Sequence, residues 1–262
     1  MNKEKTMILD EIVTATRKSL ARRKAQTPLS TLERERARQP LPRDFAGALE
    51  GQGISLIAEV KRASPSKGAL RLDLDAAALA STYSQSGAAA ISVLTESSYF
   101  RGSLADLEAV RRAVRLPILC KDFIVDPYQI YEASAYGADA VLLIVAVLTQ
   151  EELGLLLETA HLLEMEALIE VHNRDELMRA LELSPRVIGI NNRNLADFSV
   201  DLETTFKLRP LVPPETVVVS ESGIDNRKDL ICLEEAGVSA ILVGEALVIN
   251  PNPAAKIREL LG

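Results

Sequence analysis

The feature that most constrains how this chain can fold is a repeated unit of a short apolar run, a polar loop and an amphipathic stretch, which begins at Ile54. A glycine often closes the unit, as in the similar segments that begin at Gly87, Gly137 and Gly237. Glycine at such a position typically ends a helix just before the next strand. Strands that alternate with helices predict a parallel sheet with right-handed crossovers.

The repeat predicts eight strands, at 55–61, 89–95, 117–123, 140–147, 167–172, 187–192, 216–221 and 240–244. Helices are predicted between them at 76–86, 104–114, 127–136, 150–163, 174–183 and 228–236. The run AVLLIVAV (140–147) is typical of a strand that is buried on both faces. Eight units in 262 residues favour a closed (β/α)8 barrel. A doubly wound open sheet is the alternative, but no GxGxxG loop follows the first strand.

The first 45 residues lie outside the repeat. Their apolar residues have roughly helical spacing over 7–23, and the charged stretch 31–38 is expected to continue as helix until the prolines at 40 and 42. This segment is too short to hold a core of its own. Residues 1–262 are therefore predicted to form a single barrel domain, with residues 1–45 as an N-terminal helical extension.

Composition excludes several classes of protein. The net charge of -7 argues against nucleic-acid binding, which depends on lysine and arginine contacts to phosphates. The N-terminus lacks the apolar core of a signal peptide, and the longest apolar run, 138–148, is too short to span a membrane. The two cysteines and two histidines form no pattern typical of a metal site. We therefore expect a cytoplasmic protein with reduced thiols and no metal, nucleic-acid or membrane partner.

Polar side chains follow the ends of at least five predicted strands, where barrel enzymes build their active sites. They are Glu59, Lys61, Lys121, Glu170, Asn191, Arg193 and Glu221. Glu59 and Lys61 share a strand face, so a purely structural ion pair is one alternative. A single lysine at a strand end is usually just solvated or ion-paired. Several mutually perturbing charges at one mouth are instead typical of a catalytic site.

Two glycine-containing loops, 220–224 and 243–246, follow the last two predicted strands. Barrel enzymes often bind phosphate there, and glycine lets backbone amides approach an anion closely. Each loop alone is a weak signal, because glycine after a strand also serves a simple turn. The loop at 64–68, after the first strand, suits either a phosphate or a mobile lid.

Three further residues have mainly structural interpretations. His172, just after the fifth predicted strand, is more often a hydrogen-bonding residue at the start of a loop. His161 falls within a predicted helix. Cys120 alternates with Lys121 along its strand, so it is expected to face the helices and pack as a small apolar side chain.

Together these segments resemble the indole-3-glycerol phosphate synthase family of tryptophan biosynthesis, over nearly the whole chain. The motifs that carry the resemblance are IAEVKRASPSKG (57–68), SVLTESSYFRGS (92–103), LCKDFIVDPYQIYEA (119–133), LIEVHNRDEL (168–177), IGINNRNL (188–195), VSESGI (219–224) and LVGEAL (242–247). Their order and spacing both fit, and as a set they are highly specific. One departure is Cys120, where we expect arginine in the family; its side chain should face away from the pocket.

The resemblance implies a carboxy-lyase that needs no cofactor or metal. The expected reaction converts 1-(2-carboxyphenylamino)-1-deoxy-D-ribulose 5-phosphate into indole-3-glycerol phosphate, carbon dioxide and water. Lys121 in KDF matches the general acid, Glu170 in IEVH a second acid/base group, and Lys61 in EVKR a lysine that assists later steps. The groups expected to position the ribulose hydroxyls or the lysines are Glu59, Asn191 and Glu221.

The resemblance also implies the substrate-binding residues. The phosphate is expected at Ser64, Gly223, Gly244 and Glu245, the aromatic ring between Phe100, Phe123 and Leu242, and further contacts at Arg193 and Ser222. The N-terminal extension matches a helical segment that packs over the barrel mouth.

Three alternatives stay open at this point. One is a barrel like phosphoribosylanthranilate isomerase, which needs one acid and one base but no decarboxylation. Another is a non-catalytic barrel that binds a phosphorylated metabolite, and the third is a scaffold subunit of a tryptophan-pathway complex. The two lysines, the three glutamates and the N-terminal extension favour the synthase. A monomer and a weak association with other enzymes of the pathway both fit the sequence.

Overall fold

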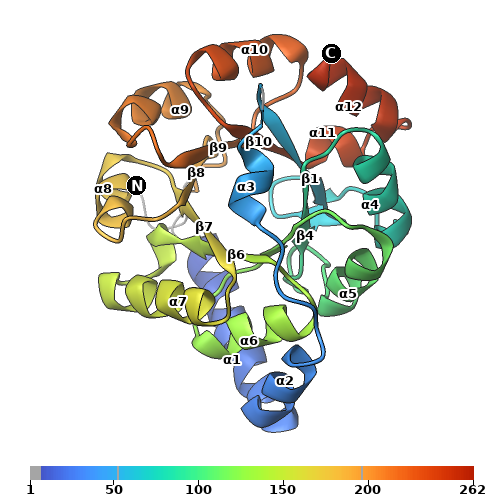
Figure 1. The fold of residues 1–262 in the computed structure, drawn as a ribbon, viewed down its shortest axis with the longest axis vertical. Coiled ribbons are helices and arrows are strands. Elements are labelled where there is room, and N and C mark those ends of the chain that lie inside the picture. The colour runs from blue at the N-terminus through green and yellow to red at the C-terminus, as the bar shows by residue number, and fades with distance from the viewer. Residues whose placement is uncertain (1–6, 52, 196) are drawn as a thin grey trace.

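The computed structural model describes residues 7–51, 53–195 and 197–262, so the first six residues of the expected N-terminal extension lie outside it. Eight parallel strands close into a barrel in the order β1-β10-β9-β8-β7-β6-β5-β4 (Figure 1). The predicted (β/α)8 barrel is confirmed, and the open sheet is excluded by the hydrogen-bonded ladder between β1 and β10. The barrel strands are β1 (Ser55–Val60), β4 (Ala90–Leu94), β5 (Ile118–Lys121), β6 (Ala140–Ile144), β7 (Glu166–Val171), β8 (Val187–Asn191), β9 (Val217–Glu221) and β10 (Ala240–Val243).

Helices surround the strands as an outer ring (Figure 1). They are α4 (Ala76–Gln85), α5 (Leu104–Ala113), α6 (Pro127–Ala135), α7 (Gln150–Leu162), α8 (Arg174–Leu181), α9 (Glu203–Leu208), α10 (Arg227–Glu235), α11 (Glu245–Val248) and α12 (Pro253–Leu261). Most begin at a polar N-cap side chain, for example Asp75 before α4 and Asn173 before α8. Among the described residues, no helix is both long and apolar enough to cross a membrane.

The predictions missed α9, α11 and α12, and they continued the fourth strand to Val147, where the chain instead forms a 3-10 turn, η1 (Val145–Val147). The apolar run does not mark this change because Val145 stays fully buried in the turn. A short hairpin of β2 (Ala63–Ser64) and β3 (Gly68–Ala69) follows β1.

Alternate residues along the strands point to opposite faces and belong to two separate apolar cores. Leu119 and its inward-facing equivalents fill the barrel interior, whereas Cys120 lies in the layer between strands and helices, as predicted. Burial raises the pKa of the Cys120 thiol to about 12, so it stays a neutral small side chain.

A short helix that the sequence analysis missed, α3 (Phe45–Leu49), closes the N-terminal end of the barrel. Phe45 and Leu49 are fully buried in the inner core, and Figure 1 shows α3 across the centre of the ring. Asp44, which caps α3, pairs with Arg186 at the start of β8 at 2.9 Å.

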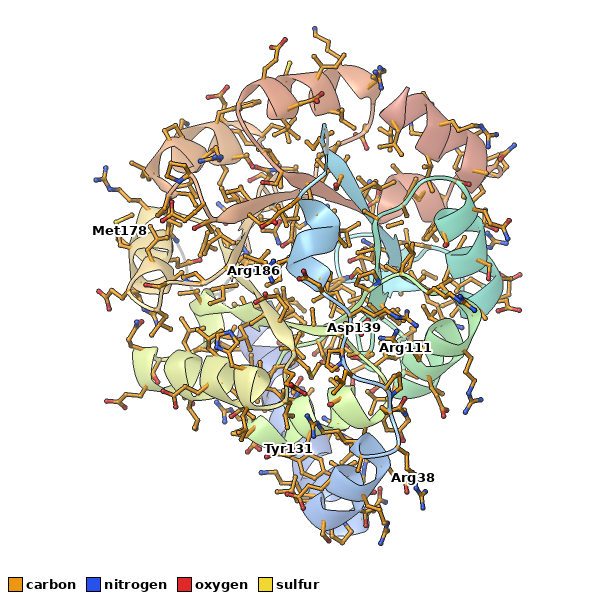
Figure 2. The ribbon with its side chains drawn as sticks, in the orientation of Figure 1. Arg38, Arg111, Tyr131, Asp139, Met178 and Arg186 are labelled. Carbon is orange, nitrogen blue, oxygen red and sulfur yellow. The ribbon has the colours of Figure 1, made fainter. Side chains whose placement is uncertain are left out.

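Below this helix, Asp139 links three segments at the same end of the barrel (Figure 2). Its carboxylate accepts hydrogen bonds from the backbone N–H of Arg43 at 2.8 Å and of Ile118 at 2.7 Å, and it pairs with Arg111. The one acidic residue in the 138–148 run therefore has a structural role, far from the mouth.

Two N-terminal helices, α1 (Met7–Gln26) and α2 (Leu29–Arg36), pack beside α6. The α1 side chains of Arg23 and Lys24 pair with Glu132 and Asp126, the second pair at 2.6 Å. The Tyr128 hydroxyl donates to the Thr27 carbonyl at 2.8 Å. These contacts anchor the C-terminal end of α1 to α6 and so set the orientation of α1.

Candidate active site

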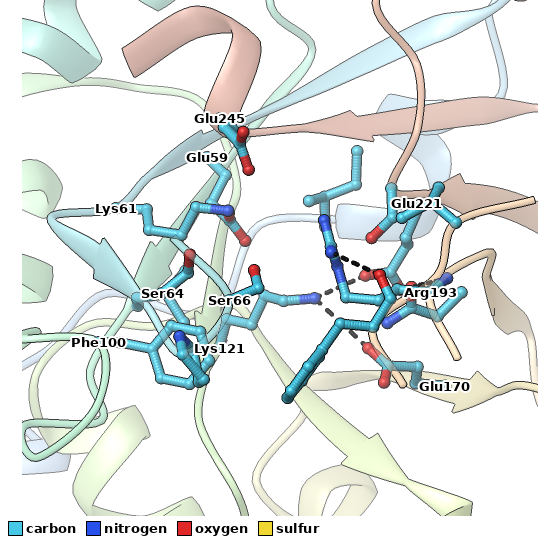
Figure 3. Close-up of a pocket in the computed structure, with 18 of the residues that line it drawn as sticks. Glu59, Lys61, Ser64, Ser66, Phe100, Lys121, Glu170, Arg193, Glu221 and Glu245 are labelled. Carbon is cyan, nitrogen blue, oxygen red and sulfur yellow. Dashed lines mark hydrogen bonds and ion pairs between the residues drawn. The ribbon is translucent and has the colours of Figure 1, made fainter. Parts of the chain in front are cut away.

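A cavity of about 450 Å³ lies at the C-terminal ends of the barrel strands. The whole set of residues proposed from the sequence lines it, and Figure 3 labels several of them, among them Lys121, Glu170 and Glu221. The set is Glu59, Lys61, Ser64, Phe100, Lys121, Phe123, Glu170, Asn191, Arg193, Glu221, Ser222, Gly223, Leu242, Gly244 and Glu245. The closure of the barrel therefore brings together residues that are up to 186 positions apart in the chain (Glu59 to Glu245).

Lys121, the last residue of β5, extends into the centre of this cavity (Figure 3). Its Nζ lies 2.6 Å from Oε2 of Glu221 and 3.4 Å from Oε2 of Glu170. Burial alone would lower the pKa of Lys121, but the carboxylates of Glu221, Glu170 and Glu59 outweigh it and raise this pKa above its usual value. Lys121 is therefore a buried ammonium group, which can act as a proton donor.

Lys61 forms a second ammonium–carboxylate pair with Glu59 at 2.8 Å. Glu59 is 3% exposed and packs against the start of the loop after β10. A Cβ at Gly244 would lie only 2.2 Å from Oε1 of Glu59, so a glycine is required for the carboxylate to occupy this position. Gly244 thus leaves room for the Glu59–Lys61 pair at the barrel mouth.

The two carboxylates that contact Lys121 have opposite titration behaviour. Burial raises the pKa of Glu170, but Lys121 and His172 outweigh it and lower this pKa to about 2. Burial raises the pKa of Glu221 to about 7, and the neighbouring charges of Glu170 and Glu59 act in the same direction against Lys121. Carboxyl groups with separated pKa values are typical of sites that divide acid and base roles.

Apolar side chains form one wall of the cavity. The rings of Phe100 and Phe123 are 6.1 Å apart between centroids and tilted by 39°, an arrangement suited to enclosing a flat aromatic group. The cavity is also lined by Ile8, Leu9 and Ile12 of α1, which were not predicted from the sequence. No periodicity in α1 shows which of its faces meets the mouth, because this depends on its docking to α6.

Residues that follow the ends of β1, β9 and β10 also line the cavity. Ser64, Ser222, Gly223 and Gly244 line it, and Lys67 Nζ lies 3.6 Å from Oε1 of Glu245 across the mouth. Lys67 also lines this cavity and was not singled out from the sequence.

Arg193 lines the same cavity. Its Nη1 donates to the Phe198 carbonyl at 3.2 Å, and its backbone N–H donates to the Asn191 side chain at 3.0 Å. The guanidinium is therefore held by the β8 loop.

His172 was interpreted as a hydrogen-bonding residue at the start of a loop. Its backbone N–H does donate to Glu176 at 2.8 Å. Its ring also lies 3.2 Å from Glu170, which the sequence analysis did not anticipate. In the described part of the chain, no group of three or more histidine, cysteine, aspartate or glutamate side chains is placed to hold a metal ion.

Comparison with known proteins gives a consistent family assignment. The family model described as indole-3-glycerol phosphate synthase matches residues 9–260. The indole-3-glycerol phosphate synthase of Dehalococcoides mccartyi is 54% identical over 259 residues, covering 97% of this chain and all of the relative. That of Streptomyces griseus is 49% identical, covering 97% of this chain and 94% of the relative.

Solved structures of lower identity share the fold. A thiamine phosphate pyrophosphorylase from Pyrococcus furiosus superposes with a TM-score of 0.62 at 20% identity, covering 83% of this chain and 96% of that chain. The KGPDC of Streptococcus mutans has a TM-score of 0.62 at 16% identity, covering 80% of this chain and 96% of that chain. These likenesses support the barrel architecture alone.

Proposed function

Because this chain belongs to the indole-3-glycerol phosphate synthase family, we propose that the cavity at its barrel mouth is the site of that reaction, with Lys121 as the proton donor for ring closure. The protein is a carboxy-lyase of tryptophan biosynthesis. It converts 1-(2-carboxyphenylamino)-1-deoxy-D-ribulose 5-phosphate into indole-3-glycerol phosphate, carbon dioxide and water. The observation that carries the site assignment is the buried Lys121 ammonium between two carboxylates, facing an aromatic wall.

Ring closure requires the substrate ketone to become electrophilic. The ring carbon that bears the carboxylate attacks the ketone carbon, and the ketone oxygen takes the proton of Lys121. The bond to the carboxylate then breaks, carbon dioxide leaves, and the electron pair restores the aromatic ring. A positioned proton donor of this kind contributes roughly 10²–10⁴-fold to the rate. The substrate's own amine supplies the electrons, so no step depends on a cofactor.

Dehydration requires a second acid and a base. Glu170 is ionised, since its pKa is lowered to about 2, and it is suited to remove a proton from the carbon beside the nitrogen. Lys61 pairs with Glu59 at 2.8 Å and is suited to protonate the hydroxyl that leaves as water. We therefore assign the base to Glu170 and the acid to Lys61. Asn191 and Glu221 orient the ribulose hydroxyls and Lys121.

Binding groups surround this acid-base cluster. We assign the phosphate to the loops that carry Ser64, Gly223, Gly244 and Glu245, with Ser222 and Arg193 beside them. The aromatic ring lies against the wall that Phe100, Phe123 and Leu242 form. This places the reacting carbons between Lys121 and Glu170, which is the orientation that ring closure needs.

The N-terminal extension completes the site in this proposal. Ile8, Leu9 and Ile12 of α1 line the cavity, so α1 packs over the substrate within a single barrel domain. The substrate is the one partner we assign, and we place the enzyme in the cytoplasm, as a monomer or in weak association with other enzymes of the pathway.

The decisive experiment follows indole fluorescence after the carboxyphenylamino-deoxyribulose phosphate is added to purified protein in EDTA. Wild type is expected to form product, whereas Lys121→Ala is expected to lose turnover while its substrate affinity stays nearly unchanged. Lys228→Ala, at an exposed position on α10, is the matched control and should behave as wild type. Absence of product from wild type would favour an isomerase or a binding protein, and a loss of affinity in proportion to rate would contradict the role of Lys121.

A further inference from the structure

We propose that His172 is a positioning residue for Glu170: its ring, held by Glu176, supplies a positive charge that keeps the Glu170 carboxylate ionised and aimed at the reacting atoms. This proposal rests on the base role of Glu170 in the proposed function. His172 is not among the residues that line the 450 Å³ cavity but lines an adjoining one that shares Asn191 and Arg193 with it, so the proposed role is exerted through Glu170.

The geometry places His172 and Lys121 on the two oxygens of one carboxylate. His172 Nε2 lies 3.2 Å from Oε1 of Glu170, and Lys121 Nζ lies 3.4 Å from Oε2. The imidazole side chain is 9% exposed and the Glu170 side chain 4%. The His172 contact is electrostatic, because Nε2 has no hydrogen-bond partner among the described residues, and a cation beside each oxygen favours the ionised carboxylate.

The ring of His172 is in turn fixed from its other side. Nδ1 lies 3.0 Å from Oε2 of Glu176, the third residue of α8. The Asn173 amide donates to the other Glu176 oxygen at 2.6 Å, and Asn173 also caps α8. The positive end of the α8 dipole favours a carboxylate at this position. Glu176 is therefore anchored to the helix start and anchors His172 in turn.

The charge balance of the mouth explains why a cation is needed there. Around Lys121 Nζ, three carboxyl groups, those of Glu59, Glu170 and Glu221, face the two amino groups of Lys61 and Lys121, so acidic groups outnumber basic ones. An uncompensated negative charge in a buried site drives one carboxylate to take up a proton. His172 places a further basic group beside Glu170, and Glu176 lies on the other side of its ring.

Titration behaviour agrees with this geometry. Burial lowers the pKa of His172, but the carboxylates of Glu170 and Glu176 outweigh it and raise this pKa to about 10, so the ring is an imidazolium at neutral pH. Glu170 is faced by Lys121 from β5, Glu221 from β9, and a hydrogen-bonding Asn191 from β8. Lys121 gives up its proton in the proposed ring closure. His172 is then the cation beside Glu170 that keeps its charge.

A purely structural role for His172 needs only its backbone N–H and Nδ1, both of which bind Glu176. The contact of Nε2 with Glu170 is what distinguishes the two roles. An asparagine amide can take the place of Nδ1 and keep Glu176, whereas a glutamine amide reaches the place of Nε2 and can keep Glu170 without a charge. His172→Asn and His172→Gln therefore separate structure, orientation and charge.

Steady-state kinetics over a range of pH test the proposal. We expect His172→Asn to lower kcat about tenfold or more, a part of the base contribution of Glu170, with little change in KM. Its acid limb of kcat should move toward neutral pH, because the pKa of Glu170 rises without the imidazolium. His172→Gln should restore part of kcat. His161→Asn, on the exposed side of α7, is the matched control and should leave rate and profile unchanged.

Nitrogen-15 NMR provides a readout that does not depend on activity. The chain has two histidines, so His161→Asn assigns the remaining imidazole signal to His172. We expect that signal to report an imidazolium at pH 8 in wild type, and Glu176→Gln to lower the pH at which the ring loses its proton.

The outcomes separate the two proposals. An inactive wild-type enzyme contradicts the proposed function and leaves the NMR result to stand by itself. In an active enzyme, the role of His172 is overturned by a neutral ring at pH 7, by an unchanged kcat and pH profile in His172→Asn, or by equal losses in both His172 variants together with a lower melting temperature.

Discussion

Replacing Phe45 with alanine tests whether the fold separates stability from catalysis at its two ends. Phe45 is 0% exposed and lies in the inner core, where α3 closes the N-terminal end of the barrel. Truncation of a fully buried phenylalanine removes its apolar transfer free energy and leaves a cavity, which together cost about 3–5 kcal/mol. The rigid strands limit collapse around the cavity, so we expect a value of about 4 kcal/mol within that range. Phe45→Leu should cost much less.

Equilibrium unfolding in urea, with the slope checked for two-state behaviour, gives this free energy directly. Leu41→Ala is the control: Leu41 lies just before α3 in sequence but is 73% exposed, so its change should stay within about 0.5 kcal/mol. Since the cavity lies at the other end of the strands, kcat and KM of folded Phe45→Ala should match wild type. A loss under about 1 kcal/mol would refute the burial argument, and a fall in kcat without unfolding would refute the separation of the two ends.

Three further changes probe other parts of the molecule. Gly244→Ala places a Cβ at 2.2 Å from Oε1 of Glu59 and must displace that carboxylate, so kcat/KM should fall by about 10²-fold in the fluorescence assay; an unchanged value would show that Glu59 can move freely. Ile12→Ala removes part of the α1 wall and should raise KM by about fivefold with kcat retained; an unchanged KM would place α1 outside the substrate site. Burial raises the pKa of Glu132 to about 7 despite the opposing effect of Arg23. The protonated Glu132 carboxyl therefore stabilises the folded state fully at a pH below the pKa of the unfolded chain. This stabilisation is lost as the pH rises through 7. Glu132→Gln should therefore gain in melting temperature relative to wild type between pH 5 and 8, and a constant difference would contradict the raised pKa.

Most of the barrel could be predicted from sequence because its strands are short apolar runs and several of its helices end at a glycine just before the next strand. The short elements could not. In α3, a five-residue helix with Gly47 at its centre, there is no room for a helical period to repeat. The signal that was present is Asp44, whose side chain accepts from the Gly47 N–H as an N-cap. Its burial is set by the open end of the barrel, which is a property of the closed fold.

The part of the candidate site that lies at the strand ends could be predicted, because the barrel topology alone determines it. Parallel strands that close into a barrel must bring their C-terminal ends together, so Lys121 and Glu170 meet although 49 positions separate them. The α1 residues that line the site could not be predicted, because their position depends on the ion pair between Arg23 and Glu132. No sequence pattern links these two segments. A signal for His172 did exist, because Glu170 and His172 share a strand face.

The pKa values of Glu170 and Glu221 shift in opposite directions because different groups contact each carboxylate on the side away from Lys121. Both contact the same lysine, Glu221 more closely, at 2.6 Å against 3.4 Å. On distance alone Glu221 would be the better stabilised anion, yet its pKa is raised while that of Glu170 is lowered. The second side of each group differs in its charged neighbour: His172 Nε2 lies 3.2 Å from Oε1 of Glu170, an ion-pair distance without hydrogen-bond geometry, whereas Oε1 of Glu221 faces the pull of Glu170 and Glu59 against Lys121. The lysine alone therefore does not determine which carboxyl group stays ionised, and His172, in the loop after β7, adds to the lowering of the pKa of Glu170.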